Sequence, residues 1–300
     1  MLLTEFLSSG IASLESLYPT AEARSIMLML CSHVLGTKSY THILEPSFTI
    51  DSRRLPLLQE SLDRLVKGEP IQYVIGLTEF CGFTFKVNHD VLIPRPETEL
   101  LCREAIKMVS RKKRMRGAYG KSAGPVRVLD LCTGSGNIAW TLALSVPGAV
   151  VVGVDISPEA LAVASGQDFA RELKDTGAIA PTYVQADILL DPHAGLGKFD
   201  VILSNPPYIM ESEKKLLRRN VLEYEPARAL FVTDEDPLVY YRAVAAWSLD
   251  LMAPDARCLT EINECLGPET RKVFTSAGFT DTEIIRDFYD RNRFIYYALK

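Results

Sequence analysis

The chain has 300 residues, of which 47% are hydrophobic and 24% charged, and its formal net charge at pH 7 is −5. This length suits two domains of ordinary size, and the balance is typical of a soluble protein with a sizeable core. An excess of acidic residues argues against a bare nucleic-acid partner, because such binding relies on Lys and Arg releasing counterions. We therefore expect no stable binding to nucleic acid.

The six cysteines are scattered and form no C-x-x-C pair, so the usual zinc spacing is absent. In a chain of this length we expect buried free thiols and not a disulfide framework. The N-terminus lacks the basic start of a signal peptide. Residues 137–154 carry no charge over nearly the length of a membrane span, but Pro147 and Gly148 interrupt them. This stretch predicts a helix followed by a buried strand, so we expect no membrane association and a cytoplasmic location.

The first segment predicts a small helical domain over residues 1–70. Apolar residues recur there at three- and four-residue spacing, and Pro19, Gly36, Pro46 and Gly68 separate about four helical stretches. The helical spacing then gives way to an alternation of apolar and polar residues, because Phe83, Phe85 and Val87 are separated by single polar residues. Residues 71–95 therefore predict a linking β-hairpin, in which residues 79–81 pair with the strand around Phe85.

The next segment, VLIPRPETE at 91–99, predicts a rigid turn bracketed by prolines and a helix from about Glu97 to Val109. Residues 110–125 follow as a basic, glycine-containing break with five basic residues between 111 and 116. We interpret this break as a solvated link; a contact with RNA or with acidic side chains is the alternative.

From residue 96 onward the chain predicts an α/β domain, residues 96–300. After residue 125, strands alternate with helices, which indicates a parallel, doubly wound sheet. The last two strands have no helix between them, so the final one is expected to run antiparallel at or near the sheet edge. The predicted strands cover about 126–131, 149–155, 182–187, 199–204, 256–262, 280–287 and 292–300, and the helices about 136–146, 157–174, 237–252 and 267–276.

A glycine loop follows the first strand of this domain. Gly134, Gly136 and Ala139 satisfy G-x-G-x-x-G/A, and Asp155 follows Gly136 at the end of the next strand. Glycines let a ligand approach the backbone, and a carboxylate at that strand end can accept hydrogen bonds from ribose hydroxyls. Any adenosine-containing cofactor would suit this loop, including NAD.

Two further carboxylates bear on the choice of cofactor. Asp130 lies inside the first strand, where it would repel a pyrophosphate but favour a cofactor with a sulfonium and an ammonium group; alternatively it caps the amides of its own loop. Asp187 could accept from an adenine amino group, with Ile188 covering the ring, although an Asp after a strand is also a common turn residue. These residues favour S-adenosylmethionine over NAD.

The sequence Asn205-Pro206-Pro207-Tyr208 follows the fourth strand, at the sheet edge where ligands bind in open α/β folds. An amide nitrogen is a poor nucleophile and must be held in line with its electrophile. The Asn205 side-chain oxygen and the Pro206 carbonyl can accept its two N–H groups, proline rigidity aims the carbonyls, and Tyr208 can pack on the amide plane. This turn predicts methyl transfer to a planar NH2 group, with no metal required. Enzymes that methylate the amino groups of adenine or cytosine carry similar sequences, which leaves a nucleic-acid substrate as the alternative.

The chain resembles the release factor glutamine N5-methyltransferases (the HemK/PrmC family) in three blocks that span most of its length. These blocks are GEPIQYVIG through PRPETE at 68–99, LDL with TGSG and IA at 129–139, and SNPPYI with YEP and AL at 204–230. The resemblance implies a class I (Rossmann-like) methyltransferase domain that uses S-adenosylmethionine, and an N-terminal helical domain that helps to dock the release factor. The substrate would be the glutamine of the factor's Gly-Gly-Gln loop.

The resemblance also assigns site residues. The substrate-amide site matches Asn205, Pro206, Pro207 and Tyr208, and the cofactor positions match Cys132, Thr133, Gly134, Ser135, Gly136, Asp155, Asp187, Ile188 and Asn205. Three departures concern loop detail: Cys132 stands where glycine is usual, residues 231–236 replace a glycine-rich turn, and residues 261–265 lack the usual glycine and glutamine.

Overall fold

The computed structural model describes residues 1–118, 124–190 and 195–299. Its contacts divide the chain into a helical unit, Met1–Leu77 with Leu217–Tyr224, and a sheet unit, Thr78–Leu216 with Glu225–Lys300. Residues 71–77 thereby belong with the helices and residues 78–95 with the sheet, whereas the sequence analysis gave 71–95 a segment of their own.

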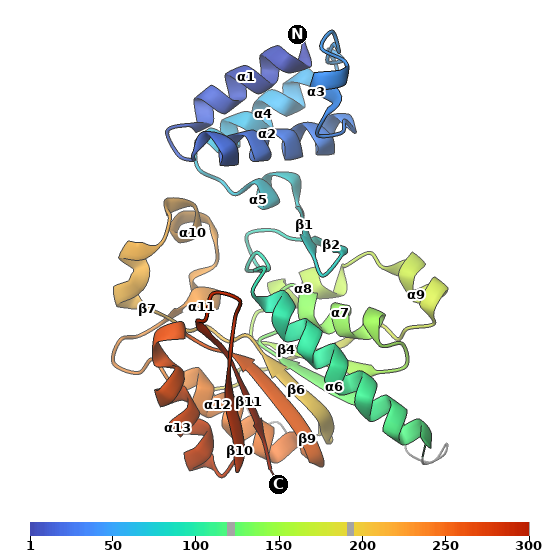
Figure 1. Cartoon of the computed structure of the whole chain (residues 1–300), viewed down its shortest axis with the longest axis vertical. Coiled ribbons are helices and arrows are strands. Elements are labelled where there is room, and N and C mark those ends of the chain that lie inside the picture. The colour runs from blue at the N-terminus through green and yellow to red at the C-terminus, as the bar shows by residue number, and fades with distance from the viewer. Residues whose placement is uncertain (119–123, 191–194, 300) are drawn as a thin grey trace. The chain divides into compact units, whose positions relative to one another are not determined.

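Figure 1 shows the helices of the helical unit gathered into a bundle. Their core consists mainly of leucine and isoleucine side chains. Gly10 permits the close approach of the first two helices, because a Cβ there would lie 2.2 Å from Met27 Cε. Gly36 ends the second helix in the left-handed conformation, as its C-cap. The unit contains α1 (Leu3–Leu14), α2 (Thr20–Leu35), α3 (Thr41–Leu44), α4 (Leu55–Val66), α5 (Ile71–Ile75) and α10 (Arg219–Tyr224).

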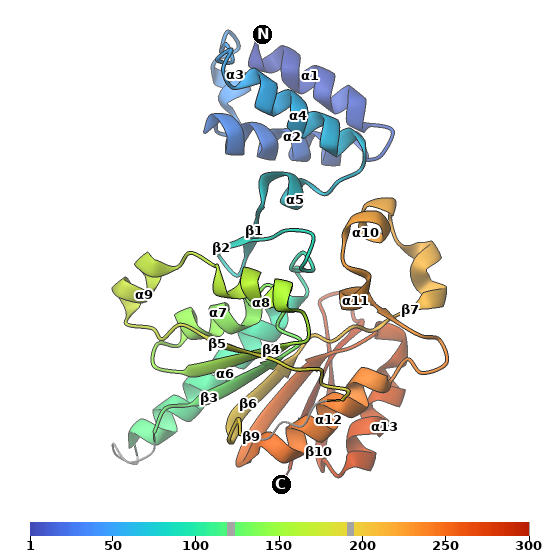
Figure 2. The same cartoon turned by 180° about the vertical axis from the view of Figure 1, so that it is seen from behind.

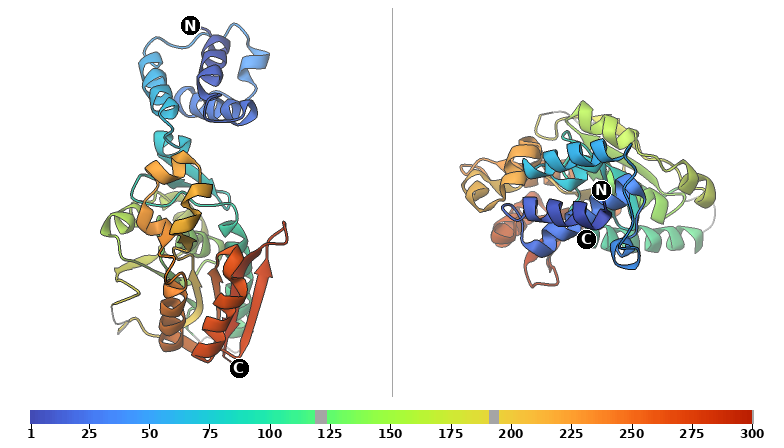
Figure 3. Two further views of the ribbon diagram at one scale, coloured as in Figure 1. Left: turned by 90° about the vertical axis from the view of Figure 1, so that its left-hand side faces the viewer. Right: turned by 90° about the horizontal axis from the view of Figure 1, so that it is seen from above.

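The sheet unit is built on one large, mostly parallel sheet, as the sequence predicts. Its strands are β3 (Arg127–Leu131), β4 (Val150–Asp155), β5 (Thr182–Gln185), β6 (Phe199–Ser204), β9 (Met252–Glu261), β10 (Asp281–Arg286) and β11 (Asn292–Ala298). Among the described residues they are ordered β10-β11-β9-β6-β3-β4-β5. In this order β11 runs opposite to the other strands, and it lies one strand inside the edge formed by β10. In the side view of Figure 3 the turn that joins β10 to β11 projects from the sheet.

Helices cover both faces of this sheet (Figure 2). Neighbouring residues of one strand face opposite layers: Val128 packs in the core beneath α6 and α7, and Leu129 in the core beneath α12 and α13. Both faces are therefore apolar, which explains the near-continuous hydrophobic runs of the strands. The remaining elements are α6 (Thr98–Ala118), α7 (Asn137–Ser145), α8 (Pro158–Ser165), α9 (Ala170–Thr176), α11 (Ala227–Leu230), α12 (Val239–Leu251), α13 (Gly267–Ala277), the 3-10 helices η2 (Glu211–Leu216) and η3 (Glu264–Leu266), and the short strands β7 (Ile209–Met210) and β8 (Phe231–Val232).

The predicted hairpin is confirmed as β1 (Leu77–Phe80) and β2 (Phe83–Lys86). Phe80 and Phe85 are fully buried in the core of the sheet unit, so the hairpin is part of that core. Residues 137–154 form α7 and β4, and no helix within the described ranges is long and apolar enough to span a membrane.

The basic segment was predicted wrongly as a solvated link, because α6 continues through it to Ala118. Lys112 is buried and pairs with Asp255 at 2.8 Å, and Arg116 pairs with Asp200 at 2.6 Å. These acidic partners, far away in the sequence, neutralise the last turns of the helix and let it pack on the sheet. Residues 119–123 of the predicted link lie outside the described part of the chain.

The single helix predicted over 157–174 is also wrong, since α8 ends at Ser165 and α9 begins at Ala170. Between them, the Gln167 side chain accepts from the Lys86 amide at 2.8 Å and donates to the carbonyl oxygens of Lys86 and Ser135. Phe169 then inserts between aromatic rings of the core. These tertiary contacts outweigh the helical period of the segment.

Candidate active site

A cavity of about 300 Å³ lies at the carboxyl ends of β3, β4, β5 and β6. The order of strands reverses at β3, which has β4 on one side and β6 on the other, and open α/β sheets bind ligands at such a point. Of the residues predicted for the site, those lining the cavity are Cys132, Thr133, Gly134, Ser135, Asp155, Asp187, Ile188, Asn205 and Pro207. The glycine loop and the proline turn therefore face one cavity, whereas Gly136, Pro206 and Tyr208 are not part of its lining.

The loop after β3 adopts left-handed backbone conformations at three positions: φ is +61° at Cys132, +55° at Gly134 and +76° at Gly136. Glycine takes this conformation without steric cost, which explains why a cysteine at position 132 is a departure. At Gly136 space is limiting as well, because a Cβ would lie 2.6 Å from the Tyr183 hydroxyl. The sharp turn at Gly136 starts α7 directly beneath the cavity.

Asp155 ties the glycine loop to the end of β4. Its Oδ2 accepts from the Gly134 amide at 2.8 Å and its Oδ1 from the Ser157 amide at 3.0 Å. Burial raises the pKa of this carboxyl, and the two amide hydrogen bonds act in the opposite direction. At the end of β5, Asp187 Oδ1 similarly accepts from the Leu189 amide at 2.9 Å.

Asp130 lies beneath the loop instead of in the cavity wall. It is fully buried, and its Oδ2 accepts from the Thr133 hydroxyl at 2.6 Å. Burial raises the pKa of Asp130 to about 7. The interaction of Asp130 with a cationic cofactor stays a prediction; its contact with Thr133 shows that Asp130 supports its own loop.

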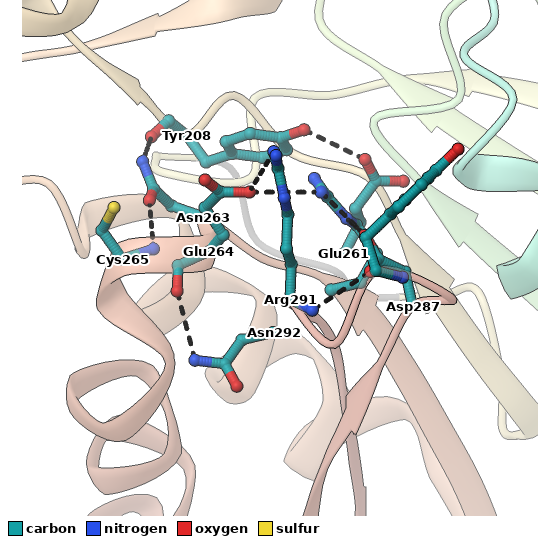
Figure 4. Close-up of polar contacts among 10 residues, drawn as sticks. Tyr208, Glu261, Asn263, Glu264, Cys265, Asp287, Arg291 and Asn292 are labelled. Carbon is teal, nitrogen blue, oxygen red and sulfur yellow. Dashed lines mark hydrogen bonds and ion pairs between the residues drawn. The ribbon is translucent and has the colours of Figure 1, made fainter.

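The turn after β6 is fixed by side chains. The Asn205 amide Nδ2 donates to the Thr98 hydroxyl at 3.2 Å, and the Tyr208 hydroxyl donates to Glu261 Oε1 at 3.0 Å. The Tyr208 backbone carbonyl accepts from Asn263 Nδ2 at 3.1 Å, so both the backbone and the ring of Tyr208 are held (Figure 4). Burial, followed by the neighbouring Glu261 charge, raises the pKa of Tyr208 well above its ordinary value.

The sequence analysis gave no site role, from the residues themselves, to the segment that precedes α6. His89, Leu92, Arg95 and Thr98 line the cavity. Arg95 is fixed by an ion pair of 2.6 Å with the buried Glu225, which also accepts from the Ile93 amide at 3.2 Å. The available signal was the pair of proline-rich motifs PRPETE and YEP, but nothing in their spacing predicts that they meet. In the described ranges, no three His, Cys, Asp or Glu side chains are grouped so as to hold a metal ion.

Comparison with known proteins defines the class of this site. A family model described as a methyltransferase domain matches residues 124–295, and a model described as the PrmC N-terminal domain matches residues 5–76. Among solved structures, the hMettl16 catalytic domain in complex with the MAT2A 3'UTR hairpin 6 has a similar fold, with a TM-score of 0.51, 12% identity and 84% of each chain covered. The chain is thus an S-adenosylmethionine-dependent methyltransferase.

Full-length relatives narrow the class. The release factor glutamine methyltransferase of Bacteroides thetaiotaomicron is 34% identical over 94% of this chain and 95% of its own length. That of Flavobacterium psychrophilum is 33% identical over 98% of both chains. The protein belongs to the release factor glutamine methyltransferase family, which confirms the resemblance seen in its motifs.

Proposed function

We propose that this enzyme methylates the N5 amide nitrogen of the glutamine in the Gly-Gly-Gln loop of peptide chain release factors. The main support is that Asn205 and Pro207 line the same cavity as the glycine loop and Asp155. A turn suited to a planar amide then faces a loop suited to an adenosine-containing cofactor. A cytoplasmic location is part of this proposal, because translation takes place there.

The cavity fits S-adenosylmethionine by its donor set. Asp155 and Asp187 offer carboxylates at neighbouring strand ends for hydroxyl and amino donors, and Ile188 adds an apolar surface. The open space at Gly134, where an added Cβ would meet nothing within 4 Å, allows a ligand to approach the backbone. When bound, the cofactor supplies an electrophilic methyl group, so the protein has to provide binding and orientation.

We assign the substrate amide to Asn205, Pro206 and Tyr208. The Asn205 oxygen and the Pro206 carbonyl each accept one N–H of the glutamine amide, which holds the nitrogen in place and stabilises positive charge that builds on it. Pro206 is buried and lacks an N–H, so its carbonyl direction is fixed and no donor competes. Tyr208 follows these residues in the same turn, and we assign its ring to pack against the amide plane.

We also propose that the helical unit docks the release factor. The large apolar side chains of Tyr40, Ile43 and Leu44, in α3 and at its N-cap, are exposed. Large apolar side chains exposed close together in the sequence are candidates for a protein contact. In this assignment the helices hold the factor while its glutamine loop enters the cavity, with residues 1–70 as the docking domain, 71–95 as the hairpin linker and 96–300 as the methyltransferase domain.

The alternative function is methylation of amino groups in nucleic acid, and the basic segment 111–116 was the feature that favoured it. The basic residues Lys112 and Arg116 already pair with Asp255 and Asp200, which leaves fewer cations in that segment for phosphates.

The proposal is tested by incubating the full chain with release factor and S-adenosylmethionine labelled in the methyl group. We expect label on the factor and none on a factor whose loop glutamine is replaced by alanine. Label that persists on the altered factor, or transfer to DNA or RNA but not to the factor, would remove the glutamine assignment.

A further inference from the structure

We propose that Thr98 and Glu261 are positioning residues that set the direction of the Asn205 amide and hold Tyr208 in the turn after β6. The inference rests on the proposed function, since it explains how the acceptor oxygen of Asn205 comes to face the substrate. Neither residue was singled out by the sequence motifs as a contributor to this step.

Both residues reach the site because of the topology. Glu261 ends β9, which runs parallel to β6 with Thr260 opposite Ser204, so the residues that follow this pair lie side by side. Thr98 is the first residue of α6. Thr98 and Glu261 are each only 1% exposed, so water cannot replace their hydrogen bonds easily.

The hydrogen bonds fix the direction of each donor. Thr98 Oγ1 donates to Glu261 Oε2 at 2.7 Å, and the Tyr208 hydroxyl donates to Glu261 Oε1 at 3.0 Å. A hydroxyl has one hydrogen, so Thr98, having donated it to a carboxylate, can only accept from Asn205. Asn205 therefore turns its Nδ2 to Thr98 at 3.2 Å, and its Oδ1 is the end available to a substrate N–H.

Glu261 is suited to this task because a carboxylate accepts on both oxygens. Burial, and to a smaller extent the charge of Glu97, raise the pKa of Glu261. The hydroxyls of Thr98 and Tyr208 and the charge of Arg293 act in the opposite direction. Arg293 is itself held by an ion pair of 3.0 Å with Asp287, at the start of the β10–β11 turn. A buried carboxylate costs free energy that an apolar side chain of similar size would avoid, so its place here points to orientation rather than stability.

Replacement of Thr98 tests the first link. Thr98→Val keeps the shape but removes the hydroxyl, and we expect kcat on release factor to fall on the order of 10- to 100-fold with little change in cofactor affinity. Thr98→Ser should restore most of the rate. Thr260→Val is the matched control, because that buried hydroxyl contacts Tyr297 and not Asn205; its kcat should stay close to wild type. An unchanged kcat in Thr98→Val, or an equal fall in Thr98→Ser, would overturn the inference.

Glu261→Gln provides a second route should Thr98→Val fold poorly. Glutamine replaces one carboxylate oxygen with an NH2 group, so it can no longer accept from Thr98 at one end and from Tyr208 at the other. We expect a lower kcat with cofactor affinity retained. A Glu261→Gln enzyme with wild-type kcat would contradict the positioning role.

The side-chain NH2 signals of Asn205, observed by NMR with labelled asparagine, separate this inference from the proposed function. One amide proton should shift when Thr98→Val removes its acceptor and return in Thr98→Ser, whatever the substrate of the enzyme. Identical Asn205 signals in wild type and Thr98→Val refute the hydrogen bond, whereas a wild-type enzyme that leaves release factor unlabelled refutes only the function.

Discussion

The cavity has two walls that differ in the groups that fix them. We call the wall after β3 and β4 the backbone wall, and the wall after β6 and β9 the side-chain wall. After β3 and β4 the contacts are made by the backbone: the amides of Gly134 and Ser157 hold Asp155, and left-handed turns shape the loop. After β6 and β9 they are made by side chains, in a chain of hydrogen bonds from Asn205 through Thr98 to Glu261. The first wall can therefore accept a change of side chain such as Cys132, whereas the second depends on the identity of each residue.

The sharpest test of this contrast is Asn205→Ala, in the side-chain wall. It removes an acceptor of the substrate N–H, and we expect kcat to fall on the order of 10³-fold. The melting temperature should change little, because Asn205 is only half-buried at a strand end. Transfer rates to release factor, with the melting curve as control, measure both quantities. A variant with the wild-type rate would contradict the assigned mechanism.

Asp155→Ala should act on binding instead of turnover. The change removes a carboxylate from the cavity and leaves the Gly134 and Ser157 amides without their acceptor. We expect the cofactor dissociation constant to rise on the order of 10- to 100-fold, with kcat at saturating cofactor affected much less. Calorimetric titration measures the affinity, and Asp155→Asn, which keeps one acceptor, should lie between the two. A fall in kcat with unchanged cofactor affinity would contradict the assignment of Asp155 to cofactor binding.

Asp130→Asn addresses the support beneath the backbone wall. Burial raises the pKa of Asp130 to about 7 in the folded protein, above the ordinary value of about 4. The native state thus holds a proton that the unfolded chain releases, so this contribution to stability is present at low pH and is lost as pH rises through about 7. Asparagine keeps the oxygen that accepts from Thr133 and does not titrate.

The melting temperature of Asp130→Asn relative to wild type should therefore increase between pH 5 and pH 8. Asp155 and Glu261, whose pKa values are also raised, are present in both proteins and cancel in the comparison. A difference that stays constant across this range would show that Asp130 does not titrate there.

The smallest effect is expected for Cys132→Gly. Glycine relieves a left-handed residue, which favours the folded state by ~1 kcal/mol, but it also adds freedom to the unfolded chain, worth ~0.4–1 kcal/mol. Stability and kcat should both stay near wild type, as measured by urea unfolding and transfer rates. A large loss of activity would mean that the Cys132 side chain, and not only its backbone, serves the site.

The features that follow from local sequence were predictable. The β1–β2 hairpin, the parallel sheet, the glycine loop and the turn at Asn205 all carry periodicity or turn residues that act over a few positions. The position of Asn205 and Pro207 opposite the glycine loop follows from strand ends meeting at one edge of the sheet.

What the sequence did not reveal depends on partners far away along the chain. The partner of Thr98 in its hydrogen bond is 163 residues distant, and the contact that breaks the helix after Ser165 joins residues 81 apart. Similarly, α6 extends through a basic segment because Asp200 and Asp255 meet it from two strands. No spacing rule within a segment contains this information, since each contact is decided by how the elements pack.

The place of β11 between β9 and β10 has a consequence for how the protein folds. β10 cannot pair with β9 directly, because the space between them belongs to a strand that comes later in the chain. The β10–β11 hairpin, whose turn is closed by Asp287 through the amides of Tyr289 and Arg291, is the local structure that can form early. Docking of this hairpin on β9 is the long-range step, and it sets Phe294 opposite Glu261, which accepts from the Thr98 and Tyr208 hydroxyls.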